Sequence, residues 1–193
     1  MQKPYLVAIY GSPRRGGNTD TLLNEFLKGA SSQRCIQRVI VPSELGISPC
    51  QGLNQCFKDG ACVIKDGMSE ILEEVRQASH LVVASPVYFM GPPASLKIFI
   101  DRFQPMWAWY NILGREKPDK KERKGFIIIT QATKEDTAMY RPTLSILRAF
   151  LSVTQFSQAG ELIAQGLDEK DDARQDTTLL RQAFEAGKSF ITK

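Results

Sequence analysis

The sequence predicts an α/β fold in which helices cover both faces of a five-stranded parallel sheet. Short apolar runs alternate with amphipathic helical patterns five times along the 193 residues. Parallel strands need crossover connections, and the intervening helices supply them. Two unusual loops, 11–19 and 85–93, directly follow the first and third apolar runs. The chain length suits one sizeable core, so we expect residues 1–193 to form a single domain.

Each element is predicted from its own pattern. The strands are expected at 5–10, 35–42, 81–84 and 125–130, and within 156–164. A helical pattern that starts with Leu22, Leu23, Phe26 and Leu27 follows Asn18 and Thr19, and helix signals resume at Met68. Further helices are expected to cover 95–103, 137–151 and 170–192. Three segments are expected to lie outside regular elements. They are a Cys- and Gly-rich irregular stretch at 43–65, an aromatic loop at 103–110 and an exposed charged segment at 115–124.

The strand number suggests where a ligand would bind. Five strands in a chain of this length fit the flavodoxin-like three-layer sandwich, with sheet order 2-1-3-4-5. In that order ligands bind beyond the carboxyl ends of the first and third strands. The loops 11–19 and 85–93 follow these two strands, so the topology predicts that they lie side by side.

The first of these loops has the composition of a phosphate site. The start of a helix presents unpaired N–H groups and partial positive charge, and glycines allow close backbone approach. The residues that favour this interpretation are Gly11, Ser12, Arg14, Arg15, Gly16, Gly17, Asn18 and Thr19. The alternative is an ordinary loop of a parallel α/β fold. The spacing matches neither the dinucleotide nor the nucleotide-triphosphate glycine motif.

Charge and hydropathy narrow the function classes. The net charge of +4 comes from interspersed acids and bases, without a basic stripe, which favours small anionic ligands over nucleic acid. No apolar run approaches the length of a membrane span, and the N-terminus shows no leader pattern, so we expect a cytoplasmic protein without a membrane partner.

The motifs GSPRRGGNT (11–19) and SPVYFMGPPASLKIFIDR (85–102) resemble those of the flavodoxin-like NAD(P)H-dependent FMN reductases, including the iron–sulfur flavoprotein branch. The similarity covers most of residues 1–103. It implies that the first loop binds the FMN phosphate, that 86–91 wraps the isoalloxazine ring, and that a third loop at 130–133 completes the pocket. That third loop is usually glycine-rich in the family, whereas here it reads TQATK. The implied FMN contacts are Ser12, Arg14, Gly17, Asn18, Thr19, Pro86, Val87, Tyr88, Phe89, Met90, Gly91 and Thr130.

The resemblance implies an oxidoreductase that takes hydride from NADPH or NADH and passes electrons to a small acceptor, such as a quinone, a flavin, a nitro or azo compound or a metal. We name no catalytic side chain, because the cofactors supply the reactive atoms. His80, the single histidine, is expected to be structural or exposed. Arg14 or Arg15 could meet the extra phosphate of NADPH. The alternatives are a flavodoxin-type electron carrier and a flavin-binding redox sensor.

Two further segments allow more than one interpretation. Cys50, Cys56 and Cys62 resemble the cluster ligands of iron–sulfur flavoproteins, but Leu53 stands at the second ligand position. We therefore favour reduced thiols and no metal over a cluster, a zinc site or a disulfide. The aromatic segment 103–110 is either a satellite core or a subunit interface. Relatives are generally dimers or larger, so we expect a homodimer or a dimer of dimers.

Overall fold

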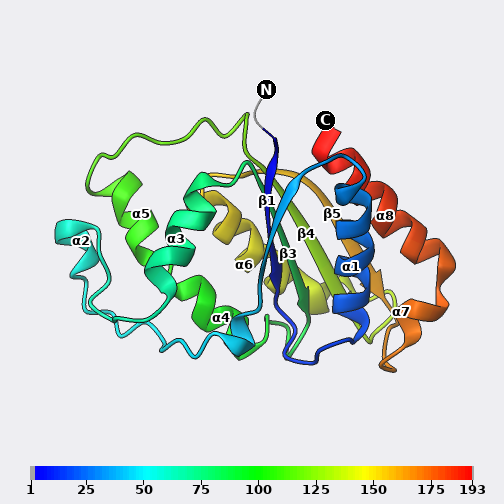
Figure 1. The fold of residues 1–193 in the computed structure, drawn as a ribbon. Coiled ribbons are helices and arrows are strands. Elements are labelled where there is room, and N and C mark those ends of the chain that lie inside the picture. Colours follow the sequence, from blue (N-terminus) through cyan, green and yellow to red (C-terminus); the bar gives the residue numbers. More distant parts are fainter. Residues whose placement is uncertain (1–2, 193) are drawn as a thin grey trace.

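The computed structural model describes residues 3–192 and contains the predicted parallel sheet (Figure 1). All four strand pairings are parallel, and the strand order is β2-β1-β3-β4-β5. The predicted fold class, a flavodoxin-like three-layer sandwich, is therefore confirmed. The strands are β1 (Tyr5–Tyr10), β2 (Ile36–Ile40), β3 (His80–Pro86), β4 (Lys124–Gln131) and β5 (Ser157–Gln165).

Helices form the two outer layers (Figure 1). On one face of the sheet lie α3 (Met68–Gln77), α4 (Ala94–Asp101), α5 (Gln104–Asn111) and α6 (Thr137–Val153). On the other face lie α1 (Asn18–Ser31), α7 (Asp172–Gln175) and α8 (Thr177–Thr192). A 3-10 turn η1 (Pro42–Glu44) and a short helix α2 (Cys56–Asp59) belong to the long connection between β2 and α3. No helix in the described part of the chain is long and apolar enough to cross a membrane.

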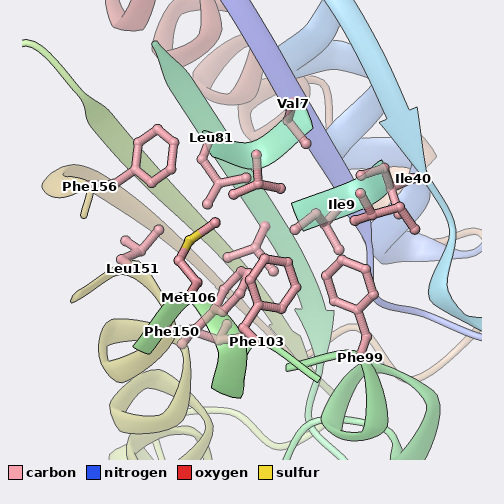
Figure 2. Close-up of a cluster of buried hydrophobic side chains, with 14 of the residues drawn as sticks. Val7, Ile9, Ile40, Leu81, Phe99, Phe103, Met106, Phe150, Leu151 and Phe156 are labelled. Carbon is pink, nitrogen blue, oxygen red and sulfur yellow. The ribbon is translucent and has the colours of Figure 1, made fainter. Parts of the chain in front are cut away.

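Two hydrophobic cores lie on opposite faces of the sheet because successive side chains of a strand alternate in direction. In β1, Val7 and Ile9 belong to one core, whereas Leu6 and Ala8 belong to the other. Figure 2 shows the first core, in which Phe99 and Phe103 pack near strand residues such as Ile9. Both faces of the central strands are thus covered, which leaves the ends of the sheet for a ligand.

The segment 103–110 differs from its expected form. It was predicted to be a loop, but most of it forms helix α5, which begins at Gln104. Met106, Trp109 and Tyr110 are buried in the large hydrophobic core on this face of the sheet, so the segment belongs to the main core and does not form a separate satellite core. Trp107 is its only aromatic side chain that the structure leaves partly exposed.

The C-terminal segment was predicted to be one helix over 170–192, and it is two. Helix α7 ends at Gln175, and α8 begins at Thr177. Asp176 separates them, and its carboxylate accepts a hydrogen bond from the Leu179 N–H at 2.9 Å. Asp176 therefore caps α8, while α7 lies against the beginning of α1, where the Ala173 N–H donates to the Asn18 side chain.

Candidate functional site

A cleft lies at the carboxyl ends of β1 and β3, where the strand order reverses direction. The loop after β1 is tied to β3 by a hydrogen bond from Gly11 N–H to the Ala84 carbonyl, at 2.8 Å. A Cβ atom on Gly11 would lie 2.5 Å from that carbonyl oxygen and 2.4 Å from a Leu96 methyl group. Only glycine therefore permits this approach, and it brings the two predicted loops side by side.

The first turn of α1 faces this cleft with unpaired donors. Gly17 is the N-cap, and no side chain caps the helix. Within the described residues, the N–H groups of Asn18, Thr19 and Asp20 donate to no acceptor. Ser12, which is almost fully buried, exchanges hydrogen bonds with the Arg14 backbone at 3.1 and 3.2 Å and fixes the loop. This arrangement suits an anion at the helix N-terminus.

The two arginines of the loop have different surroundings. Arg15 donates to the buried Asp20 carboxylate at 2.8 Å, and its guanidinium lies over the Tyr10 ring at 4.7 Å. Burial raises the pKa of Asp20, while the Gly16 N–H and Arg15 oppose that rise. Arg14 lines the cleft and forms no ion pair with any described residue. Arg14 is therefore the cation available to a ligand.

Asn18 and Thr19 hold the site together through contacts distant in sequence. The Asn18 amide donates to the carbonyls of Leu167 and Glu169, at 3.4 and 2.7 Å, and accepts from Ala173 N–H at 2.9 Å. The hydroxyls of Thr19 and Thr130 are 2.6 Å apart and buried. These bonds place the loop after β4 and the loop after β5 against the start of α1.

The loop after β3 forms the apolar side of the cleft. Val87 N–H donates to the Thr130 carbonyl at 2.9 Å. Tyr88 and Gly91 exchange two backbone hydrogen bonds, at 2.8 and 2.9 Å, across a tight turn. Val87 and Tyr88 line the cleft, whereas the Phe89 side chain is fully exposed.

The cleft encloses about 190 Å³. The predicted contacts that it brings together are Ser12, Arg14, Asn18, Thr19, Pro86, Val87, Tyr88 and Thr130. Gly17, Phe89, Met90 and Gly91 do not line it. Gln131 and Ala132 come from the expected third loop, whereas Leu167 and Asp168 were not foreseen. The chain around 167 carries no ligand-binding motif. It reaches the cleft because β5 pairs with β4, the Leu167 N–H donates to the Gln131 carbonyl at 3.0 Å, and the Asn18 amide donates to the Leu167 carbonyl.

His80 lies outside the cleft. It is buried at the beginning of β3, its ring packs edge-on against Phe190, and its Nδ1 is 2.9 Å from the Ser79 hydroxyl. Burial, with a smaller contribution from Lys124, lowers the pKa of His80 to about 4. The structural interpretation of this histidine is thus confirmed, and the ring is neutral at neutral pH.

A five-stranded parallel sheet of order 2-1-3-4-5, with a cleft at its switch point, is typical of a flavodoxin-like protein. The family model described as NADPH-dependent FMN reductase matches residues 4–157, and the chain belongs to this family. An iron–sulfur flavoprotein of Methanocaldococcus jannaschii is 37% identical over 101 residues, which are 52% of this chain and 52% of that protein. The chain thus spans about half the length of the curated relatives that it matches.

Solved structures share the fold at low sequence identity. A NAD(P)H:quinone oxidoreductase from Methanothermobacter marburgensis has a TM-score of 0.69 and 19% identity, over 97% of this chain and 94% of that one. An FMN-dependent NADH-azoreductase from Bacillus anthracis, solved in complex with FMN, has a TM-score of 0.67 and 14% identity, over 99% and 98% of the two chains.

The cysteine segment does not fit a four-thiolate cluster. Within residues 3–192, no three His, Cys, Asp or Glu side chains are placed to hold a metal ion. Leu53 is exposed, and the Cys62 thiol is 3.6 Å from the buried Arg102 guanidinium, which also binds Asp66 at 2.6 and 2.9 Å. All four cysteines are free thiols in the structure. Arg102 thus anchors this segment to the end of α4.

Proposed function

We propose that the chain is an FMN-containing oxidoreductase that accepts hydride from NADPH or NADH and passes electrons to a small-molecule acceptor. The observation that carries the proposal is one cleft with two chemically different ends. One end has the free N–H groups of α1 and the unpaired Arg14, and the other has Val87 and Tyr88. A flavin mononucleotide has the matching halves, a phosphate and a flat, largely apolar ring.

The residues of the cleft fit FMN in distinct roles. Arg14 and the first turn of α1 would hold the phosphate, and Val87 with Tyr88 would contact the ring. Thr130 and Gln131 would contribute polar contacts from the third loop. When bound, FMN supplies the chemistry of hydride acceptance, so the chain's own task is to bind, orient and partly shield the ring.

Two further proposals concern the assembly of the protein and its location in the cell. We propose a homodimer, because three apolar side chains at positions 88–90 are exposed beside the cleft. A cytoplasmic location stays a prediction, which the four free thiols support.

The deciding experiment is an anaerobic absorbance spectrum of the FMN-loaded protein before and after addition of NADPH. We expect flavin bands near about 450 nm that bleach within the turnover time. Bands that bleach only with a partner reductase would support the electron carrier instead. Bleaching without turnover of any acceptor would support the redox sensor. A protein that binds no FMN would contradict all three.

A further inference from the structure

The loop after β5 places a carboxylate in the wall of the cleft. Asp168 is an exposed residue that lines the cleft together with Arg14 and Asn18. Its charge is opposite to the one that favours a phosphate. It also lies beyond residues 4–157, which the family model matches. Membership of the family therefore gives Asp168 no role, and its position needs an explanation of its own.

The peptide groups on both sides of Asp168 are held by hydrogen bonds. The Leu167 N–H donates to the Gln131 carbonyl at 3.0 Å. The Asn18 amide donates to the carbonyls of Leu167 and Glu169, at 3.4 and 2.7 Å. Asp168 is thus fixed beside the first turn of α1. Because the backbone is already ordered, little conformational entropy remains to be lost there when a ligand binds.

Helix α7 attaches the same loop to α1 a second time (Figure 1). The Ala173 N–H donates to the Asn18 side chain at 2.9 Å, and the Arg174 guanidinium donates to the Gly16 carbonyl at 3.1 Å. The loop is therefore bonded to the start of α1 on both sides of Asp168.

Several other polar side chains of the cleft are already bonded within the protein. The hydroxyls of Thr19 and Thr130 are 2.6 Å apart. The Gln131 side-chain amide donates to the carbonyls of Thr133 and Asp136, at 2.8 and 3.1 Å. The main hydrogen-bonding capacity of these groups is therefore used inside the fold.

The Asp168 carboxylate, in contrast, has no partner among residues 3–192. Nearby, Asp171 pairs with Arg174 at 3.0 Å. Asp172 accepts a hydrogen bond from the Glu169 N–H at 2.8 Å. Asp168 has neither kind of contact, although it lines the cleft. The cleft thus contains a strong acceptor that is available to the donor groups of a ligand.

A carboxylate in this position selects hydroxyl groups. It can only accept hydrogen bonds, and a sugar or polyol offers it neighbouring O–H donors, as ribose does to the acidic residue of dinucleotide-binding folds. A phosphate brings negative charge, so a carboxylate repels it. In FMN the hydroxyls of the ribityl chain lie between the ring and the phosphate. A site for FMN therefore needs an acceptor next to its phosphate end.

We propose that Asp168 is a specificity-determining residue that accepts hydrogen bonds from the ribityl hydroxyls of the flavin; this rests on the proposed function. Arg14 and the start of α1 then hold the phosphate, and Asp168 holds the polyol next to it. The ribose of NADPH has the same donor chemistry. The bonds from Asn18 favour the ribityl chain, because they place Asp168 beside the phosphate end of the cleft.

The test compares two neighbouring carboxylates. Asp168→Ala removes the acceptor. Glu169→Ala is the matched control, because it removes the same charge from the same loop and its side chain does not line the cleft. FMN and riboflavin both carry the ribityl chain, so in fluorescence titrations Asp168→Ala should weaken the binding of both by roughly tenfold. Glu169→Ala should change neither affinity by more than about twofold.

Two further measurements separate a lost hydrogen bond from a damaged site. Lumiflavin has no ribityl chain, so it should bind to the wild type and to Asp168→Ala equally well. Asp168→Asn keeps one acceptor oxygen, and its affinity for both flavins should lie between those of the wild type and Asp168→Ala. The Tm of the ligand-free variants should equal that of the wild type, because the Asp168 side chain is exposed and has no partner to lose.

The possible failures differ from one another. Tighter FMN binding by Asp168→Ala with unchanged riboflavin binding would show that the carboxylate only repels the phosphate, and would overturn the proposal. Unchanged binding of both flavins with a higher KM for NADPH would overturn it in favour of the ribose. An equal loss of lumiflavin affinity would overturn it as well. A wild type that binds neither FMN nor riboflavin would contradict the proposed function itself, whereas a flavin-binding wild type with an indifferent Asp168→Ala would contradict this assignment alone.

Discussion

At the scale of single residues, the two neighbouring arginines of the first loop illustrate how environment decides function. Both carry the same charge in the sequence. Arg15 neutralises the buried Asp20 and stacks on Tyr10, so its charge is already used within the fold. Arg14 faces the cleft without a partner among the described residues. The sequence indicated both arginines as candidates for binding a phosphate, and only the structure distinguishes their roles.

Replacement of each arginine by glutamine should therefore have different consequences. Arg14→Gln should weaken FMN binding by roughly ten- to a hundredfold, because a charge-assisted hydrogen bond contributes about 1.5–3 kcal/mol. Arg15→Gln should leave FMN affinity nearly unchanged but lower the free energy of unfolding, since it leaves Asp20 buried without its cation. Fluorescence titration with FMN and urea unfolding measure the two effects. A larger loss of affinity for Arg15→Gln would reverse the assignment.

His80 makes stability depend on pH. Its folded-state pKa is about 4, below the usual value of 6.5, so the neutral ring stabilises the fold above pH 6.5. That contribution is lost as the pH falls toward 4, because the unfolded state binds the proton more tightly. Between pH 7 and about 4.5 we expect a loss of roughly 2–3 kcal/mol from this residue.

The variant His80→Gln isolates this contribution from the titration of carboxylates. We expect the free energy of unfolding of His80→Gln to fall less steeply than that of the wild type over the same pH range. Urea unfolding at a series of pH values measures both curves. Parallel curves would show that His80 titrates normally in the folded protein.

At the scale of elements, helices α1 and α8 approach each other closely through a pair of glycines. A Cβ atom on Gly29 would lie 2.0 Å from the Phe184 carbonyl oxygen, and one on Gly187 would lie 1.9 Å from the Phe26 carbonyl oxygen. Each carbonyl belongs to the opposite helix, so neither contact can be relieved by a side-chain rotation. The position of α1, and with it the candidate anion site at its N-terminus, depends on this contact.

The substitution Gly187→Ala should destabilise the protein by about 2 kcal/mol or more, although alanine is the better helix former, because the helices must move apart. Gly67→Ser is the control, since nothing lies within 4 Å of its Cβ position and serine suits the N-cap of α3 that Gly67 occupies; it should change stability by less than about 0.5 kcal/mol. Thermal unfolding of both variants tests the comparison. Equal stability of the two would show that α8 is free to shift.

The elements also show what the sequence could predict. Strands and their order followed from apolar runs and crossover spacing, and the two motif loops were expected beside each other. Helix α5 was missed because aromatic composition outweighed the spacing of Phe103, Met106 and Tyr110, which suits one helix face. The break at Asp176 had a local signal, an N-cap residue, that was overlooked. Leu167 had no motif of its own, because it reaches the cleft through contacts distant in sequence, with the Gln131 carbonyl and the Asn18 amide.

At the scale of the whole molecule, the candidate site is built from segments that no local motif connects. Its anion end comes from β1 and α1, its apolar end from the turn after β3, and its remaining wall from the loops after β4 and β5. The hydrogen bonds of Asn18 and Thr19 hold the loops after β4 and β5 against α1, and the bond from Val87 N–H to the Thr130 carbonyl adds the turn after β3. A ligand that spans both ends adds to this cohesion and should stabilise the entire fold.

This coupling between ligand binding and folding predicts how much the phosphate and the ring of FMN each contribute to the stability of the fold. At a hundred times its dissociation constant, FMN should stabilise the fold by about 2.7 kcal/mol. For a chain of this size, this is a rise in Tm of roughly 5–11 °C. Riboflavin at the same concentration should give a clearly smaller rise, because it would contact Val87 and Tyr88 but leave Arg14 and the α1 N–H groups without a phosphate. In Arg14→Gln, the rise with FMN should approach that with riboflavin. Equal shifts for FMN and riboflavin in the wild type would mean that the start of α1 does not hold the phosphate. The flavin would then be bound through the apolar end of the cleft alone.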